Sequence, residues 1–340
     1  MSPRRHARPL DEDDVRVRPQ RGKSRPRSKE RPRHEEAVPG FVVAVDRGRL
    51  TCVLGDPRDD RDAGAEPIAV TAVKARELGR KGVAVGDRVW LVGDVSGDAD
   101  ALARLVRLEP RTTVLRRTAD DTDPVERVLV VNADQLAVVV ALAEPEPQPR
   151  LVDRALVAAY DAGMDPLLVL TKSDLASPED FLTSYAALDV ASVVTRRGGD
   201  LAPLLARLHD RVTVMVGSSG VGKSTLVNAL VPGADRATGI VNEVTGRGRH
   251  TSTSAVALPL ATGGWIVDTP GVRSFGLAHV DPDRVIHAFP DLQAGTDDCP
   301  RACSHDEPDC ALDAWVESGA ATPARLESLR RVLRSRSGED

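Results

Sequence analysis

The sequence predicts a multidomain chain with a small β-barrel, an α/β domain on a parallel sheet, and a short, mostly helical C-terminal domain. Three observations predict this architecture. Five short β-rich runs separated by turn signals follow one another in residues 39–110. A glycine-rich loop, Gly217–Ser224, stands between a β-branched run and a helical run. Three cysteines and one histidine gather within the segment Cys299–Cys310.

Composition restricts the class of protein before any motif is considered. A chain of 340 residues is long enough for about two or three domains. Aromatic residues make up only 3%, so the core must be built from Val, Leu and Ala. No apolar run approaches a membrane span, and the N-terminus has no signal-peptide core. We therefore expect a cytoplasmic protein with no membrane partner, with reduced cysteines, and a monomer.

The N-terminal residues 1–38 differ from the remainder in charge. They hold twelve Arg and Lys against seven Asp and Glu, a net charge of +5, which leaves −10 for the rest of a chain whose total is −5. With few apolar residues this stretch cannot bury enough surface to fold alone, so a disordered basic extension is predicted. It is either a solvated tail without function or a basic arm that contacts nucleic acid.

The β-rich residues 39–110 predict a barrel of the oligonucleotide-binding (OB) type. The five expected strands are Phe41–Val45, Leu50–Leu54, Pro67–Val73, Asp87–Val92 and Ala101–Leu108. Such barrels bind RNA through a basic face with stacking aromatic residues. Phe41 and Trp90 are the only aromatic residues in this stretch, so RNA contact would depend on Arg and Lys. A purely structural barrel is equally compatible with the sequence.

The loop Gly217–Ser224 reads G-x-x-x-x-G-K-S, the pattern of a phosphate-binding loop. Glycines let consecutive N–H groups point inward, and the following helix adds its positive N-terminus. Lys223 is expected to contact the β- and γ-phosphates of a nucleoside triphosphate, and the Ser224 hydroxyl to bind Mg²⁺. The alternative is a glycine-rich turn that happens to hold Lys and Ser. The candidate nucleotide-binding residues here are Gly217, Ser218, Ser219, Gly220, Val221, Gly222, Lys223, Ser224 and Thr225.

A second motif predicts the base. Gln135–Leu142 reads as a fully buried strand, Leu151–Ala162 as a helix, and Pro166–Leu170 as a further buried strand. The last run ends in Thr171, Lys172, Ser173 and Asp174. In the Asn/Thr-Lys-x-Asp motif of GTPases the Asp accepts hydrogen bonds from N1–H and the 2-amino group of guanine. The alternative is a turn that ends a strand before a helix.

The third motif follows the phosphate loop. Gly264–Asp268 is predicted to be a strand that ends in D-x-x-G, where Asp268 would hold Mg²⁺ through water and the Gly271 amide would sense the γ-phosphate. The segment Gly239–Thr253 occupies the position of a first switch, and Thr251 or Ser252 is its candidate Mg²⁺ ligand. The guanine motif precedes the phosphate loop, the reverse of the usual order. Residues 111–278 are therefore predicted to be a circularly permuted, Ras-like GTPase domain.

The C-terminal residues 279–340 are predicted to form a zinc-binding helical domain. Cys299, Cys303, His305 and Cys310 match a closed, structural Cys₃His zinc site. A disulfide is the competing interpretation, which would leave one cysteine over. Pro323–Arg334 is expected to be a helix capped by Thr322, with a basic surface that is either an RNA contact or a solvated face.

Taken together, the barrel, the permuted TKSD, GSSGVGKST and DTPG motifs, the GRGRHTST segment and the Cys/His cluster resemble the ribosome-small-subunit-dependent GTPase A (RsgA) family. The resemblance covers about residues 38–335. It implies a bacterial cytosolic GTP hydrolase that binds the small ribosomal subunit and its rRNA, acts in late subunit maturation, and is stimulated by the subunit. GTP or GDP with Mg²⁺ and one structural Zn²⁺ are the implied cofactors. Two gaps between the zinc ligands are shorter than is common in the family, which leaves Asp306 or Asp309 as outside candidates.

The same resemblance bears on catalysis. Val272 follows the D-x-x-G motif where many GTPases have a water-orienting Gln, and valine cannot polarise water. The family's candidate for that role is His250, whose alternative is a surface histidine in a basic loop.

Two other functions are weighed against a GTPase. An ATP-dependent kinase or ATPase would require that Asp174 not lie at the base. A nucleotide-gated RNA-binding scaffold with little catalysis of its own is favoured by the missing Gln.

Overall fold

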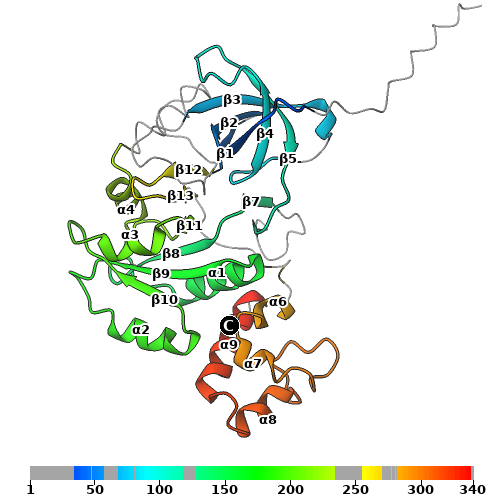
Figure 1. Ribbon diagram of the computed structural model, residues 1–340. Coiled ribbons are helices and arrows are strands. Elements are labelled where there is room, and N and C mark those ends of the chain that lie inside the picture. The colour runs from blue at the N-terminus through cyan, green and yellow to red at the C-terminus, as the bar shows by residue number, and fades with distance from the viewer. Residues whose placement is uncertain are drawn as a thin grey trace, which may run out of the picture. The chain divides into compact units, whose positions relative to one another are not determined.

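The computed structural model describes residues 34–46, 48–56, 68–79, 82–117, 127–233, 255–269, 277, 280 and 282–337. Residues from His34 onward belong to one compact unit. In this described part, strands β1–β5 and β8–β13 share one eleven-stranded sheet, and β6 and β7 form a separate two-stranded ribbon (Figure 1). No helix within the described ranges is both long and apolar enough to cross a membrane.

The first five strands close into the predicted barrel. They are β1 (Val38–Asp46), β2 (Arg49–Leu54), β3 (Ala69–Lys74), β4 (Arg88–Gly93) and β5 (Ala103–Leu108). Antiparallel pairing joins β1 to β2, β2 to β3, β4 to β5 and β1 to β4, and parallel pairing of β3 with β5 completes the ring. A short 3₁₀ helix, η2 (Arg76–Leu78), follows β3. Alternating Val, Leu and Ala side chains fill the interior. Cys52 lies among them, and burial raises the pKa of its thiol to about 12.

The second half of the sheet has the strand order β10-β9-β8-β11-β13-β12. Its strands are β8 (Gln135–Ala141), β9 (Asp165–Thr171), β10 (Ala191–Val194), β11 (Val212–Val216), β12 (Val256–Pro259) and β13 (Trp265–Asp268). All are parallel to their neighbours except β12, which runs antiparallel to β13. The strand before the phosphate loop, β11, lies between β8 and β13 in the middle of this half of the sheet, although β8, β9 and β10 all precede it in the chain. This arrangement is the predicted permuted α/β sheet.

Helices cover both faces of this sheet. They are α1 (Pro149–Ala162), α2 (Glu179–Tyr185) with the 3₁₀ turn η3 (Ala186–Leu188), α3 (Ala202–Leu208) and α4 (Lys223–Leu230). The buried side of α1 packs with alternate residues of β8, β9 and β11, whereas α3 and α4 pack with the residues between them. Every residue of β8 is buried, as its apolar sequence predicts.

Polar and apolar contacts fix the barrel to the α/β half of the structure. The ribbon of β6 (Val114–Arg117) and β7 (Arg127–Val131) lies between them in the chain. The Val131 N–H donates to the Val85 carbonyl over 3.0 Å, and the buried Asn132 amide donates to the Gly86 carbonyl over 2.8 Å. On the other side β1 pairs with β12, and the rings of Phe41 and Trp265 lie 5.3 Å apart. Phe41 is therefore a core residue and offers no surface for stacking RNA.

The C-terminal helices are α6 (Pro282–Ile286), α7 (Pro290–Gln293), α8 (Ala311–Glu317) and α9 (Pro323–Ser337). As predicted, Thr322 caps α9, because its hydroxyl accepts the Arg325 N–H over 3.2 Å. The helix packs against α1 through Leu326, Leu329 and Val332.

The arginines of α9 bind other parts of this chain. Arg325 pairs with Asp291, Arg330 with Asp313, and Arg331 with the buried Asp153. Arg334 pairs with Asp306 and Glu327. The basic surface that the sequence offers for RNA is thus largely engaged in intramolecular ion pairs.

Candidate nucleotide site and metal centre

Three predicted motifs begin where three strands of the parallel sheet end. The phosphate loop (Gly217–Ser224) follows β11, the guanine loop (Thr171–Asp174) follows β9, and Asp268 ends β13. Met215 of β11 is in register with Asp268, and Thr171 is in register with Ala141 of β8. Carboxyl ends of parallel strands lie at one edge of a sheet, where open α/β folds bind ligands. The fold thus brings the motifs to one edge.

Glycine is required at several points of the phosphate loop. Gly220 and Gly222 have φ angles of +83° and +91°, the left-handed region that disfavours other residues. A Cβ on Gly217 would lie 2.6 Å from the Val139 carbonyl oxygen, so the loop rests directly on β8. The side chain of Val221, a residue of the loop itself, is buried. The loop leads into the N-terminus of α4, whose free N–H groups suit phosphate.

The side chains of the loop divide by exposure. Ser219, Ser224 and Thr225 are exposed, whereas Ser218 is half-buried. Lys223 is only 12% exposed because its ammonium forms an ion pair with the Asp268 carboxylate. Asp268 and Ser224 offer a carboxylate and a hydroxyl, the hard oxygen ligands that Mg²⁺ prefers. These donors fit the predicted magnesium role.

Thr171 connects the guanine loop to the phosphate loop. Its buried hydroxyl donates to the Val221 carbonyl over 2.6 Å and lies 3.3 Å from the Val140 carbonyl. Lys172 follows with a φ of +59°, and its ammonium donates to the Glu144 carbonyl. The Ser173 N–H donates to the Thr195 carbonyl over 3.3 Å. Asp174 remains exposed at the tip of the loop.

Several contacts at the site are not apparent from its motifs. The buried Thr269 hydroxyl donates to the Met215 carbonyl over 2.8 Å and so fixes the chain directly after Asp268 to the strand before the phosphate loop. The carbonyls of Glu144 and Thr195 come from loops without a recognisable motif. The D-T-P-G pattern marks Thr269 in the sequence, and the β-rich run that ends at Thr195 indicates a strand and loop that could lie beside the base. His250, Thr251, Ser252 and Gly271 lie outside the described residues.

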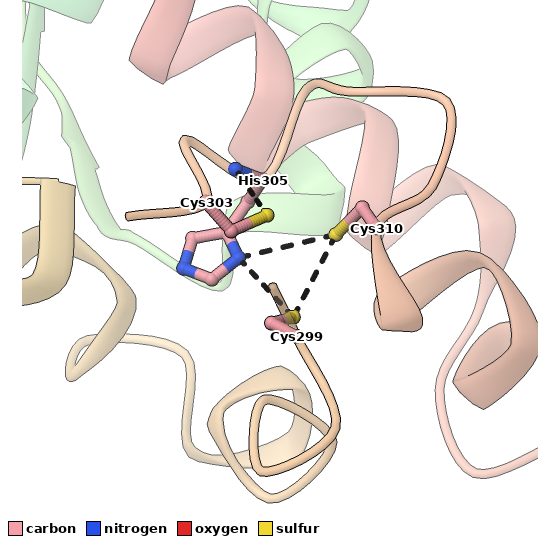
Figure 2. A group of neighbouring side chains, drawn as sticks. All are labelled: Cys299, Cys303, His305 and Cys310. Carbon is pink, nitrogen blue, oxygen red and sulfur yellow. Dashed lines mark hydrogen bonds between the residues drawn. The ribbon is translucent and has the colours of Figure 1, made fainter. Parts of the chain in front are cut away.

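A second site lies in the C-terminal domain, where Figure 2 shows Cys299, Cys303, His305 and Cys310 facing one another. Their ligand atoms all lie within 4.8 Å of one another. The Cys299 and Cys310 sulfurs are 3.9 Å apart, and His305 Nδ1 is 3.8 Å from Cys299 Sγ and 3.9 Å from Cys310 Sγ. Zn–S bonds of about 2.3 Å place two sulfurs of a tetrahedron about 3.8 Å apart. The donor set and its spacing therefore fit Zn²⁺.

Neighbouring groups shape this metal centre. The Arg330 guanidinium donates to the His305 carbonyl over 2.9 Å and ties the loop to α9. The Ser304 N–H donates to Glu307, which holds the pKa of that carboxyl at about 2. Burial raises the pKa of the Cys303 thiol to about 12.

The alternatives for the cluster find no support in its geometry. A disulfide needs sulfurs about 2 Å apart, and all four cysteines of the chain are free thiols. Asp306 faces Arg330 and Arg334 instead of joining the four ligands, and Asp309 is not part of the group either.

The comparisons with known proteins agree with this geometry. The family model described as RsgA GTPase matches residues 108–278. A protein of Gemmatimonas aurantiaca named small ribosomal subunit biogenesis GTPase RsgA is 39% identical over 265 residues, which cover 75% of this chain and 86% of that protein. Small ribosomal subunit biogenesis GTPase RsgA 1 of Vibrio vulnificus is 36% identical over 305 residues, which cover 85% and 83%.

Two solved structures share the fold. YjeQ from Thermotoga maritima aligns with a TM-score of 0.61 and 23% identity, covering 89% of this chain and all of that one. YloQ, described as a circularly permuted GTPase, aligns with a TM-score of 0.63 and 21% identity, covering 92% and 99%. At such identities the likeness establishes the fold alone, including its permuted order.

Proposed function

The chain belongs to the RsgA GTPase family, and from that premise we propose that it hydrolyses GTP in the biogenesis of the small ribosomal subunit. The observation that carries the proposal is the meeting of the phosphate loop, the guanine loop and Asp268 at one edge of the parallel sheet. The names of the two curated relatives supply the ribosomal context.

The described residues suit the binding of GTP. N–H groups of the phosphate loop and the N-terminus of α4 hold the phosphates, and Lys223 exchanges its Asp268 partner for phosphate oxygens. The exposed Asp174 carboxylate accepts the guanine N1–H and 2-amino donors. Thr171 keeps base and phosphate sites in register through its bond to Val221.

Hydrolysis then proceeds in line. Water attacks the γ-phosphorus, the bond from the γ-phosphorus to the β–γ bridging oxygen breaks, and GDP and phosphate leave without a covalent enzyme intermediate. The Ser224 hydroxyl, Asp268 through water, and Thr251 or Ser252 would hold Mg²⁺, which would supply positive charge to the triphosphate. The Gly271 amide senses the γ-phosphate. Zn²⁺ at the C-terminal cluster has a structural role.

Orientation of the attacking water is assigned to His250. Val272 cannot accept or donate a hydrogen bond through its side chain, and the resemblance to the family offers His250, in the sequence R-H-T, as the group for this role. A water-orienting group in a switch segment has its full effect on the rate only when the bound partner places it beside the attacking water. We therefore propose slow basal turnover, stimulated by the small subunit during its late maturation, with rRNA bound by the barrel and the basic residues 1–38.

The deciding experiment compares GTP and ATP turnover with and without purified small subunits. Wild type should turn over GTP selectively, and small subunits should accelerate it. Asp174→Asn should lose its preference for GTP, because the amide offers a donor where guanine also offers donors. Glu179→Gln, an exposed substitution in α2, serves as the matched control and should leave both rates unchanged.

The second candidate, a nucleotide-gated scaffold, is favoured by Val272. It predicts tight, guanine-specific binding with turnover that small subunits do not accelerate. Equal turnover of ATP and GTP would contradict both functions.

A further inference from the structure

The outer surface of the barrel holds an aromatic residue that the core does not use. Along β4, Val89 and Leu91 are fully buried, and Trp90 between them points outward. Trp90 is paired across the strands with Arg107 of β5. A tryptophan ring has a large apolar surface, so a group that covers an outward-facing ring stabilises it.

Arg107 covers one face of this ring. Its guanidinium carbon lies 4.1 Å from the centroid of the indole, which is a cation–π stack. The Trp90 N–H donates to the Glu109 carboxylate, and Glu109 lies 3.6 Å from Arg107 Nε. The indole ring on one face and the Glu109 carboxylate at the edge therefore hold the Arg107 guanidinium plane in place.

The other face of that plane is available. The Arg107 side chain keeps 55% of its surface exposed although the indole covers one side. Glu109 is 39% exposed and is the acidic group beside it. Because the indole already holds the Arg107 guanidinium in one orientation, binding a ligand on its other face would cost little further side-chain entropy.

A bulge brings a second arginine to the same surface. The register shifts between Trp90 and Leu91, so that Val106 is the extra residue of β5. Arg104 and Arg107 consequently both face outward although they are three residues apart. Arg104 lies beside Val92 and Val73, with no aromatic ring beneath it in the described contacts.

We propose that Arg107, stacked on Trp90, is a platform on which an unpaired base of small-subunit RNA stacks, with Arg104 contacting the phosphate backbone. The proposal rests on the proposed function and names the barrel surface that carries it. Proteins read single-stranded RNA by stacking bases on aromatic rings and on arginine planes.

Charge decides between RNA and a protein partner. Residues 39–340 carry a net charge of −10, so a polyanion will approach only where cations gather locally. Two exposed arginines on one strand, one of them presenting a flat face, suit a base and its phosphate better than an acidic peptide, which needs no flat face.

The test uses the full chain with small subunits and, separately, single-stranded oligouridylate and an RNA duplex. Arg107→Lys keeps the charge and removes the plane, so affinity for subunits and oligouridylate should fall about 5- to 150-fold. The duplex should be affected much less. Trp90→Leu should reproduce part of the loss. The matched control is Arg76→Lys, an exposed arginine of η2 in the same barrel with no assigned RNA contact, which should stay within about twofold of wild type.

Unchanged affinity of Arg107→Lys for both probes would overturn the platform. Weaker subunit binding with unchanged oligouridylate binding would assign the surface to a ribosomal protein and overturn the RNA assignment. Equal losses for Arg76→Lys and Arg107→Lys would show that the loss is not specific to the plane stacked on Trp90, which also contradicts stacking. Wild type that binds no subunits at all would instead refute the proposed function, so the two failures are separable.

Discussion

At the residue scale, Thr171 carries a contact that holds two loops of the nucleotide site together. Its hydroxyl donates to the Val221 carbonyl in the phosphate loop over 2.6 Å, and it is buried. Thr171→Val keeps the shape and removes the donor, so the carbonyl of Val221 loses its partner, at a cost of about 1–3 kcal/mol. We expect weaker GDP binding and a lower melting temperature, measured by calorimetry.

Thr171→Ser is the control for that substitution, because it keeps the hydroxyl. It should stay close to wild type in GDP affinity. If Val and Ser variants bind GDP equally, the bond does not position the phosphate loop.

Lys223 and Ser224 should matter for turnover far more than for stability. Ser224 is exposed, and Lys223 contacts Asp268, which is itself 29% exposed and can be solvated when its partner is removed. Lys223→Ala or Ser224→Ala should therefore abolish GTP turnover and leave the melting temperature within a few degrees of wild type. A collapsed variant would contradict the assignment, as would one that still hydrolyses GTP at the normal rate.

At the element scale, the joint between barrel and sheet leaves no room for a side chain at Gly86. A Cβ there would lie 1.9 Å from the Val131 carbonyl oxygen, and the φ of +95° is itself unfavourable for alanine. Gly86→Ala should destabilise the fold by more than about 2 kcal/mol, read from chemical denaturation.

Gly48→Ala separates the clash from the backbone effect. Gly48 has a similar φ of +88° with nothing within 4 Å of a Cβ, so only the conformational cost of about 1 kcal/mol applies. If Gly86→Ala and Gly48→Ala lost the same free energy of unfolding, the structure would be relieving the Cβ clash with Val131 at no energetic cost.

The metal centre should stabilise its own domain. Its four ligands come from one short segment that contributes few core side chains, so metal binding supplies much of its folding free energy. Cys303→Ser or a chelator should unfold residues near 290–315, detected by hydrogen exchange. Cys52→Ser, a buried cysteine of the barrel, is the control and should leave zinc content unchanged. Reduced protein purified without stoichiometric zinc would refute the site.

At the scale of the whole molecule, the barrel and the nucleotide site share one row of paired residues. Ala44 of β1 is in register with Val256 of β12, Val256 with Asp268 of β13, and Asp268 with Met215 of β11. One strand, β12, therefore separates the barrel from β13 and the carboxylate assigned to Mg²⁺. A partner bound to the barrel acts close to the reaction.

His250→Ala tests whether the partner controls the chemistry. A positioned acid–base group is typically worth about 10²–10⁴-fold in rate. The variant should lose most of the subunit-stimulated rate, whereas basal hydrolysis and GTP affinity barely change. Stimulation should also weaken as salt rises, because docking of a basic arm on RNA is electrostatic. Equal loss of basal and stimulated rates would show that His250 is not the coupled residue. Salt-independent stimulation would argue against the basic arm.

Much of the architecture follows from local sequence. The five β-rich runs match β1–β5, and Leu151–Ala162 lies within α1, because alternation and apolar periodicity report burial directly. The short strand Val256–Pro259 had no such signal. This short segment, which ends in a proline, forms a strand only because it pairs with β13 on one side and with β1 on the other.

By itself, the sequence determined which chemical groups the candidate sites contain: the phosphate loop, the guanine loop, the D-x-x-G motif and the Cys₃His cluster each consist of neighbouring residues with recognisable spacing. Only the tertiary structure decided which side chains remain available to a partner. Arg325, Arg330 and Arg331 resemble a basic surface in the sequence, but distant aspartates in the fold neutralise them. Arg107 has no motif around it, yet a strand bulge and Trp90 make it a fixed, exposed plane. Local spacing specifies which groups are present, whereas availability depends on long-range pairing that a linear pattern does not contain.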